Sequence, residues 1–518
     1  MNPGRDTVNK KYWMIIVLIG FAFACTRSGG TVQIVAGTAA DPAQPTMTGK
    51  DTEAFRPTPF LPRDDPTATV TSLFSTPTLD PTREYNTPTL GPGTYVVQSG
   101  DTIDSIAKMF NVSAESIIQL NGLTNPDALE VGQTLDIPVP ETEEPGPNFK
   151  IIPDSELVFG PAADGFDPEE FLKGNTGYLR GYREMVEGKE RTGPEILLFV
   201  AEHYSVNPRI LLASLEYVAG WVSDSEPAEW KILFPFYTET GRENLYRQLA
   251  WAADQLNAGY YDWKAGLYDY WTLADGSMVR IGPGINAGTA GVQYLMSWIY
   301  GKGDWEAAVS EGGVFSTYQS MFGYPFLWSL EPIVPEGLVQ PMLMLPFEKD
   351  VLWYFTGGPH GGWGTGSAWA GLDFAPSGIG LGCQSSDDWV LASTGGLVVR
   401  SMEGAVVLDL DYDGNEHTGW TILYMHLEER DRIPPGKKVG LADRLGHPSC
   451  EGGYSNGTHV HIARRFNGEW IAADGLVPFT LGGWVASGTG NEYDGYLTKG
   501  DVTIEACDCG SDENSLWR

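Results

Sequence analysis

Positive charge is scarce in this chain. Its 518 residues include 33 Lys and Arg against 67 Asp and Glu, which gives a formal net charge of −34. Such an acidic balance excludes nucleic acid as a partner and argues against electrostatic binding to anionic membrane surfaces. The hydrophobic fraction of 42% and the aromatic fraction of 12% are high enough for folded cores. We therefore expect a folded protein, and its length allows three or four domains.

Long hydrophobic runs are also missing. A single apolar run at residues 12–24 follows three basic residues and is shorter than the ~20 residues of a membrane-spanning helix. This pattern is typical of a signal peptide, here residues 1–25. Cys25 directly after small residues resembles a bacterial lipobox, although Ala22 stands where that motif prefers leucine. We expect a lipid-modified Cys25, with plain cleavage or an uncleaved anchor as alternatives. All three outcomes predict an extracytoplasmic, cell-surface protein whose membrane contact is this N-terminal anchor.

Cysteine is rare as well. Beyond Cys25 there are four, and an even number in an oxidising compartment favours disulfides. Cys383 and Cys450 are the preferred pair because both lie in the histidine-rich segment of the chain. Cys507 and Cys509 are too close for a relaxed bridge and too isolated for a zinc knuckle, so no role is assigned to them.

Three segments have the composition of linkers or tails. Residues 26–93 are rich in Thr, Pro, Asp and Ser and show almost no apolar periodicity. Such a stretch cannot bury enough surface to offset its chain entropy, so we expect a disordered, extended tether. Residues 140–158 are interpreted as a Pro/Glu-rich linker, and residues 491–518 as a C-terminal tail.

Residues 94–139 have the pattern of a small folded module. A strand at Thr94–Val97 precedes an apolar helical face that begins at Ile103, and Ser113 caps a second helix that Asn121-Gly122 ends. A closing strand runs through Gln133–Ile137. This strand–helix–helix–strand unit resembles a LysM domain, through Tyr95-x-Val97, Ser99–Thr102, Asn121–Leu123 and Val131–Gln133.

The LysM resemblance implies binding to glycans that contain N-acetylglucosamine, such as peptidoglycan or chitin. In that family the sugar lies between the loop after the first strand and the loop after the second helix. A folded module that binds nothing is the alternative. The implied contact residues are Gly100, Asp101, Thr102, Asn121, Gly122 and Leu123.

Residues 159–346 are predicted to be mainly helical. The stretch from Asn207-Pro208 to Gly220-Trp221 resembles the lysozyme-type transglycosylase fold. In that family a glutamate acts as the general acid at the place where this chain has Val218. Glu216 is two residues away, roughly 200° around a helix, and would point elsewhere. We therefore expect an inactive helical domain, with glycan cleavage by Glu216 as the alternative.

Histidine is concentrated in the C-terminal third, where six of the seven histidines lie between His360 and His461. Imidazole is both a common zinc ligand and a common general acid or base. Residues 347–490 also switch to short strands separated by Gly, Asn and Asp, which predicts an antiparallel β domain.

Four pieces of this domain resemble, in order and spacing, the lysostaphin-type (LytM-like) zinc endopeptidases that cut peptide crosslinks in bacterial cell walls. They are Gly371–Ala375, Tyr424–Leu427, Gly436–Gly446 and Gly457–Ile462. The resemblance implies one Zn²⁺ with Asp373 and His461 as ligands. It also implies that His426 and His459 bracket the attacking water and assist catalysis.

One position departs from that family. Its first zinc histidine would stand four residues before Asp373, where this chain has Trp369. Indole offers no lone pair to a metal, and catalytic zinc normally takes three protein ligands. His360, in a Gly-rich stretch upstream, is the candidate substitute. A metal-free degenerate site and a zinc site without His360 remain as alternatives.

Together these features predict a multidomain α+β protein. It has a βααβ LysM module, a mainly α-helical middle domain and a C-terminal antiparallel β domain of the LytM-like type. The expected function is an exported cell-wall protein that binds peptidoglycan glycan and hydrolyses peptidoglycan peptide bonds with zinc. The alternative is an inactive peptidase-like scaffold, or an activator of a cell-wall hydrolase, that only binds peptidoglycan.

Overall fold

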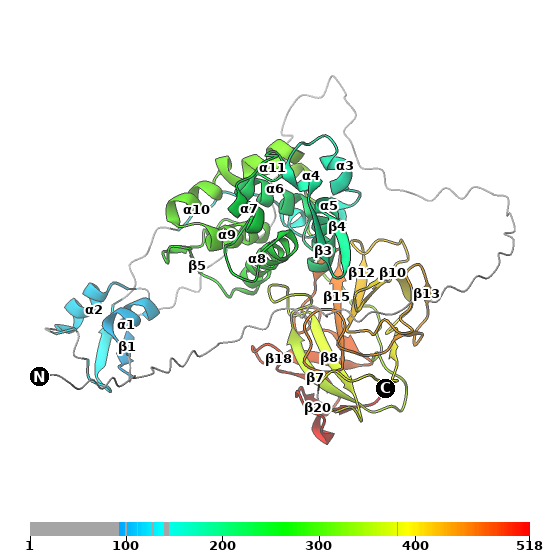
Figure 1. The fold of residues 1–518 in the computed structure, drawn as a ribbon. Helices are drawn as coiled ribbons and strands as arrows, with labels where there is room; N and C mark the ends of the chain where they lie inside the picture. Colours follow the sequence, from blue (N-terminus) through cyan, green and yellow to red (C-terminus); the bar gives the residue numbers. More distant parts are fainter. Residues whose placement is uncertain are drawn as a thin grey trace, which may run out of the picture. The chain divides into compact units, whose positions relative to one another are not determined.

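The computed structural model describes residues 93–98, 101–110, 112–123, 125–126, 129–138, 145–380 and 382–518. The predicted signal peptide with Cys25, the tether up to residue 92, and the glycan-contact candidate Gly100 lie outside the described residues. Within these ranges, no helix has both the length and the apolar character needed to cross a membrane. The described chain comprises a small N-terminal module, a helical region and a β-rich region (Figure 1).

The N-terminal module has the predicted strand–helix–helix–strand order. Its elements are β1 (Gly93–Val96), α1 (Ile103–Phe110), α2 (Ala114–Asn121) and β2 (Thr134–Ile137). The two strands are antiparallel, with Tyr95 opposite Leu135. The Ser113 side chain accepts a hydrogen bond from the backbone of Ser116 at the start of α2, and Gly122 ends the helix in the left-handed conformation. The apolar helix faces and the sheet share one core.

The helical region contains helices and two short hairpins. Its longer helices are α5 (Gly193–Tyr204), α6 (Pro208–Ala219), α8 (Leu245–Ala265) and α9 (Ala287–Ile299). Its shorter helices are η1 (Asp154–Glu156), η2 (Pro161–Ala163), α3 (Pro168–Leu172), α4 (Tyr178–Gly181), α7 (Glu229–Leu233), α10 (Lys302–Ala308), η3 (Glu311–Phe315), α11 (Ser316–Phe322) and η4 (Pro325–Trp328). The hairpins pair β3 (Arg183–Val186) with β4 (Lys189–Thr192) and β5 (Tyr270–Thr272) with β6 (Met278–Arg280).

Local sequence signals explain where the two central helices begin. A capping box between Thr192 and Glu195 starts α5. The Asn207 side chain accepts a hydrogen bond from the Arg209 backbone at the start of α6, and proline occupies the first turn. Gly220 in the left-handed conformation ends α6, which matches the predicted helix.

Residues 140–158 were predicted to be a linker. For residues 145–158, which the structure describes, this prediction is wrong. Ile151, Ile152 and Leu157 are fully buried in the core of the helical region. The Ile151 backbone N–H donates to Thr289 Oγ1 at 2.8 Å, which ties this segment to α9. The composition of the segment is that of a linker, but its few apolar side chains all point into the core. The helical region therefore includes residues 145–158.

The β-rich region is built on one nine-stranded antiparallel sheet with the order β13-β10-β11-β12-β15-β8-β7-β21, and β16 pairs with β15. These strands are β7 (Trp353–His360), β8 (Gly371–Pro376), β10 (Gly396–Met402), β11 (Ala405–Asp409), β12 (Trp420–Met425), β13 (Lys438–Val439), β15 (Val460–Phe466), β16 (Glu469–Trp470) and β21 (Ser515–Leu516). A two-stranded sheet pairs β9 (Val390–Leu391) with β14 (Arg444–Gly446).

Residues 491–518 are part of this β-rich region, so the predicted C-terminal tail is wrong. A four-stranded sheet contains β17 (Thr480–Leu481), β18 (Trp484–Gly488), β19 (Gly495–Lys499) and β20 (Val502–Glu505). A short helix, η5 (Asp512–Asn514), precedes β21, which pairs with β7. A disulfide also joins Cys507 to Cys509, although their spacing had argued against a bridge.

The large sheet has a different apolar neighbour on each face. Val406, Ile422 and Ile462 belong to the core of the β-rich region. Alternate side chains of a strand point to opposite faces, and Val407 and Ala463 join the core of the helical region. The helical region therefore packs on the sheet face that also carries His461.

Buried charges join these two regions. Arg400 Nε donates to Glu416 Oε1 at 2.8 Å, and Arg465 Nη2 donates to Oε2 of the same carboxylate at 2.5 Å. Glu202 of α5 lies beside this cluster. Burial, and then the charge of Glu416, raise the pKa of Glu202 to about 7. Folding therefore disfavours the ionised form of Glu202.

We expect Glu202→Gln to stabilise the protein more at pH 8 than at pH 5. A carboxyl whose pKa is raised from 4.5 to about 7 by folding loses stability as pH rises through that window. The neutral amide has no such dependence. Calorimetric melting temperatures of both proteins between pH 5 and pH 8 measure the effect, and a difference that stays constant with pH contradicts it.

Candidate metal centre

Three strands of the large sheet bring the candidate ligands together. β8 lies between β15 and β7, and the register places His461 opposite Asp373. On the other side Asp373 is opposite Gly357, and His360 at the end of β7 is opposite Gly371. Two register shifts separate this last pair from the regular pairing nearer the start of β7, so that His360 is opposite a residue two positions from Asp373.

The three side chains meet at one point. His360 Nε2 lies 2.8 Å from His461 Nδ1 and 3.3 Å from Asp373 Oδ1. His461 Nδ1 lies 3.1 Å from the same carboxylate oxygen. Ligand atoms at about 2.0–2.1 Å from a tetrahedral zinc are themselves roughly 3.3 Å apart, so these spacings fit a zinc site. All three residues are buried.

Backbone carbonyls fix the tautomers of both histidines. His360 Nδ1 donates to Gly358 O at 2.8 Å, and His461 Nε2 donates to Gly362 O at 3.1 Å. Because each imidazole uses its N–H in this way, His360 Nε2 and His461 Nδ1 both turn a lone pair toward Asp373. Histidines that bind a metal through one ring nitrogen typically donate the N–H of the other nitrogen to a carbonyl or carboxylate in this way.

Burial and charge act against each other in this group. Burial lowers the pKa of His360, but the Asp373 carboxylate beside it outweighs burial and leaves the pKa raised. Burial lowers the pKa of His461. Burial raises the pKa of Asp373, but His360 and His459 outweigh it and hold that pKa well below its usual range. Asp373 is thus an anion with two imidazoles against it.

His426 and His459 lie next to this group without joining it. Their ring centroids are 4.4 Å apart, and His459 Nε2 is 3.7 Å from Asp373 Oδ2. Both Nδ1 atoms donate to carbonyls, that of His426 to Glu451 O at 3.0 Å and that of His459 to Gly457 O at 2.8 Å. Each Nε2 therefore keeps a free lone pair. Burial, and then His459 and His461, lower the pKa of His426 to about 3, so it is neutral at physiological pH.

Trp369 does not take part in the group. It lies in the loop between β7 and β8, where its carbonyl accepts a hydrogen bond from the Ala473 backbone at 2.7 Å. His360 occupies the third position instead, as the last residue of a paired strand rather than as part of a mobile loop.

Tyr493 is a neighbour of the site that the sequence analysis missed. Its ring stacks on His360 with centroids 4.2 Å apart and an interplanar angle of 19°. The Tyr493 backbone is left-handed, at φ 68, and its carbonyl accepts a hydrogen bond from Gly358 at 2.7 Å. Residues held in this conformation are uncommon and cluster at functional sites. No sequence signal marked it, since it lay in the predicted tail.

The predicted cysteine pair is bridged near the site. Cys383 and Cys450 form a disulfide with Cα atoms 5.7 Å apart. Cys450 precedes Glu451, whose carbonyl accepts from His426. The bridge therefore ties the loop after β8 to the segment that orients His426.

The described residues hold one other group of candidate metal ligands. Asp409, Asp411 and Asp413 lie together in the loop after β11. Their carboxylates accept hydrogen bonds from the loop's own backbone, for example Gly414 N to Asp409 Oδ2 at 2.9 Å. This group lacks nitrogen ligands, so the histidine group suits zinc better.

The glycan-contact candidates of the N-terminal module have internal partners. The Asp101 carboxylate accepts from Tyr95 OH at 2.8 Å, and the Thr102 hydroxyl accepts from the Ser105 backbone at 3.1 Å. Asn121 exchanges two hydrogen bonds with the Asp136 backbone. Gly122 and Leu123 follow α2 directly. These side chains shape the two loops.

Glu216 is also engaged within its own region. Its Oε2 accepts from the backbone N–H groups of Val222 at 2.8 Å and Ser223 at 3.1 Å. This carboxylate therefore orders the turn after α6.

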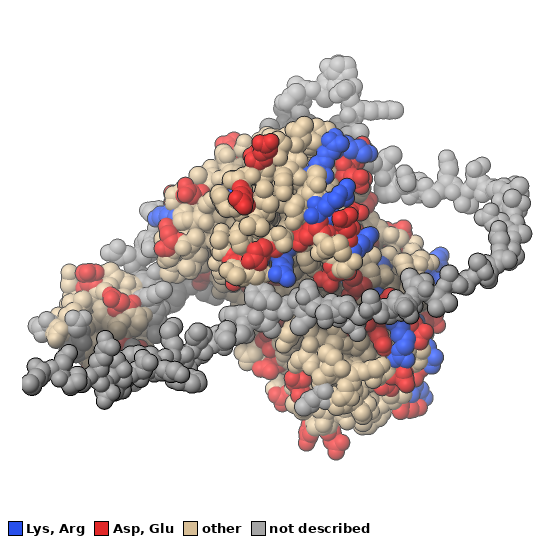
Figure 2. Space-filling view, in the orientation of Figure 1, with Lys and Arg blue, Asp and Glu red and all other residues tan. Residues whose placement is uncertain are grey.

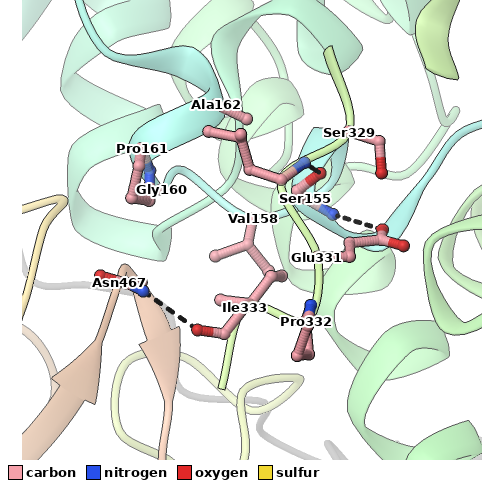
Figure 3. A pocket seen from close by; sticks show the side chains of 11 residues that line it. Ser155, Val158, Gly160, Pro161, Ala162, Ser329, Glu331, Pro332, Ile333 and Asn467 are labelled. Carbon is pink, nitrogen blue, oxygen red and sulfur yellow. Dashed lines mark hydrogen bonds between the residues drawn. The ribbon is translucent and has the colours of Figure 1, made fainter. Parts of the chain in front are cut away.

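A cleft of about 400 Å³ lies elsewhere, between the helical region and the β15–β16 turn (Figure 3). It is lined by Ser155, Glu331 and Asn467 among others and contains no histidine.

Comparisons with known proteins match two parts of the chain to families. The model of the LysM domain matches residues 95–138, and the model of the LasA N-terminal domain matches residues 150–334. Protease LasA of Pseudomonas aeruginosa is 25% identical over 346 residues, which cover 62% of this chain and 75% of that protein. The chain contains a LysM domain and a LasA-like region.

Two further matches concern single domains. A secreted LysM effector of Passalora fulva is 45% identical over 49 residues, or 9% of this chain and 22% of that protein. The solved structure of the M23 metalloprotease pseudoalterin is 24% identical and covers 35% of this chain and all of that one, with a TM-score of 0.28. The LysM prediction is confirmed. The lysozyme-type resemblance stays a prediction, because the model matched to that region is the LasA N-terminal domain.

Proposed function

We propose that the protein is an extracytoplasmic, peptidoglycan-binding zinc metalloendopeptidase. Its LysM domain would hold the glycan, and its β-rich domain would hydrolyse a peptide bond of the same polymer. Homology to a protease over most of the chain supports the peptidase activity. The net charge of −34 agrees with a partner other than nucleic acid, and Figure 2 shows Asp and Glu dispersed over the visible face with Lys and Arg among them.

The observation that carries this proposal is the convergence of three lone pairs. His360 Nε2, His461 Nδ1 and Asp373 Oδ1 face one another within 3.3 Å, and both imidazole N–H groups are already used on carbonyls. Unshared lone pairs repel at such distances, so a cation between them would stabilise the arrangement. Two nitrogens and one carboxylate are a ligand set typical of catalytic zinc.

Each residue then has a defined part. A zinc ion on His360, Asp373 and His461 would polarise the scissile carbonyl and make water a stronger nucleophile. His426 and His459 each use Nδ1 on a backbone carbonyl, so their Nε2 lone pairs can accept the proton of the attacking water. The same nitrogens then return a proton to the leaving amine.

The N-terminal features complete the proposal. A lipid on Cys25, followed by the tether, would let the LysM domain reach the cell wall from the membrane surface. The LysM loops around Asp101 and Asn121 would contact N-acetylglucosamine units. An enzyme held on its polymeric substrate in this way meets many scissile bonds at high effective concentration.

Metal removal tests the proposal. The purified chain is expected to bind one zinc and to release new amino termini from crosslinked peptidoglycan, with both properties lost in chelator and restored by zinc. Metal analysis and labelling of the new amino groups measure the two quantities. An intact crosslinked substrate in the presence of bound zinc would favour the inactive scaffold or activator. Shortened sugar chains that disappear with Glu216→Gln would indicate glycan cleavage instead.

A further inference from the structure

The loop between β7 and β8, residues 361–370, contacts both histidines of the candidate centre. It begins directly after His360, and its Gly362 carbonyl accepts the N–H of His461 at 3.1 Å. That bond decides which nitrogen of His461 carries its hydrogen and where Nδ1 points. The position of this loop therefore sets the geometry of the centre.

The loop has little capacity to hold itself in place. Four of its ten residues are glycine, which loses the most conformational freedom on folding. Its internal bonds span only a few residues. The Gly362 backbone donates to Ala368 O at 3.1 Å, the Trp363 backbone to Ser367 Oγ at 3.0 Å and the Ser367 hydroxyl to Gly364 O at 3.4 Å, while the Ala370 backbone donates to Ala368 O at 2.6 Å. The β-rich region holds the two ends of the loop, because the Gly361 backbone donates to Glu492 Oε1 at 3.4 Å and the Trp369 carbonyl accepts from the Ala473 backbone at 2.7 Å. The middle of the loop is held by the helical region.

Asp254 of α8 supplies that support. Its Oδ2 accepts from the Thr365 hydroxyl at 2.7 Å, and its Oδ1 accepts from the Gly366 backbone at 2.8 Å. A Cβ added at Gly366 would lie 2.0 Å from the Asp254 carbonyl, so the loop backbone lies directly against the helix. The Trp363 ring packs against His203 of α5, with ring centroids 4.6 Å apart.

We infer that Asp254 is a positioning residue of the metal centre. It holds the loop, the loop carbonyl at Gly362 holds His461, and His461 presents Nδ1 to the metal. The inference rests on the proposed function. It assigns a role to the helical region, which supports the site on the neighbouring sheet. Hydrogen-bond partners of metal-binding histidines change metal affinity by about 10- to 100-fold when they are lost.

The test is zinc affinity of the full chain, measured by competition with a chromogenic chelator. Asp254→Ala is expected to raise the zinc dissociation constant about tenfold. Asp254→Asn is expected to keep the wild-type value, because its amide oxygen accepts from Gly366 and its NH₂ donates to the Thr365 hydroxyl. Thr365→Ala, on an exposed residue, removes one bond only and should raise the constant by less. Visible absorption of the cobalt-loaded proteins reports the ligand geometry directly.

Arg191→Ala is the matched control. Arg191 pairs with Glu403 across the same two regions at 2.7 Å but does not contact the loop. This variant is expected to unfold at a lower temperature and to bind zinc as the wild type does. An Asp254→Ala variant with unchanged zinc affinity, or an Arg191→Ala variant with an equal loss, would overturn the inference. A wild-type chain that binds no zinc would overturn the proposed function itself, so the wild-type titration separates the two failures.

Discussion

Replacing His360 with alanine is expected to abolish both zinc binding and peptidase activity. The variant keeps Asp373 and His461, and two protein ligands hold zinc poorly where catalytic sites use three. Losing the hydrogen-bond partner of a ligand lowers metal affinity by about 10- to 100-fold. Losing the ligand itself should lower it further, so we expect zinc affinity to fall by more than about 100-fold. Metal analysis after dialysis and the release of amino termini from peptidoglycan measure the two effects.

Trp369→Phe is the control for this experiment. Trp369 stands where the lysostaphin-type pattern has its first histidine, but in the structure it lies in the loop between β7 and β8 and is not one of the three converging residues. The phenylalanine variant should therefore bind zinc as the wild type does. Retention of one zinc by His360→Ala would mean that the site uses another third ligand.

The parts of the fold that follow from local signals were predictable. Ser113 and Gly122 bound α2, and Asn207-Pro208 and Gly220 bound α6, because caps and left-handed glycines act within a few residues of each other. These features need no knowledge of distant contacts.

The third ligand could not be predicted with the same certainty, because it depends on strand pairing. His360 reaches the site through two register shifts between β7 and β8, and nothing in the sequence near Asp373 specifies those shifts. The family pattern predicts the first zinc histidine at the position of Trp369, because such a pattern compares positions along the chain. It does not take account of which residues pair across a sheet.

Tyr493 and the segment at residues 145–158 were missed for a related reason. Composition suggested a tail and a linker, but composition averages over a window. A few residues in each segment make the contacts that matter, such as Tyr493 on the His360 ring and Ile151 in the helical core. Burial of single side chains against distant elements is a property of the tertiary fold.

Replacing His459 or His426 with alanine is expected to lower kcat by about 10² to 10⁴, with one zinc still bound. Neither residue belongs to the three converging ligand atoms, and each keeps a free Nε2 because its Nδ1 donates to a carbonyl. Their loss therefore removes proton transfer and leaves metal binding intact. Zinc content and peptidase rate, measured on the same preparations, test both halves of this expectation.

The two variants also separate ligands from bases when they are compared with His461→Ala. That variant is expected to lose zinc and activity together, because His461 Nδ1 is one of the converging atoms. A loss of zinc in His459→Ala would assign His459 to the ligands, which its 3.7 Å separation from Asp373 does not favour. An unchanged kcat in both variants would contradict their part in proton transfer and would leave water or a substrate group as the base.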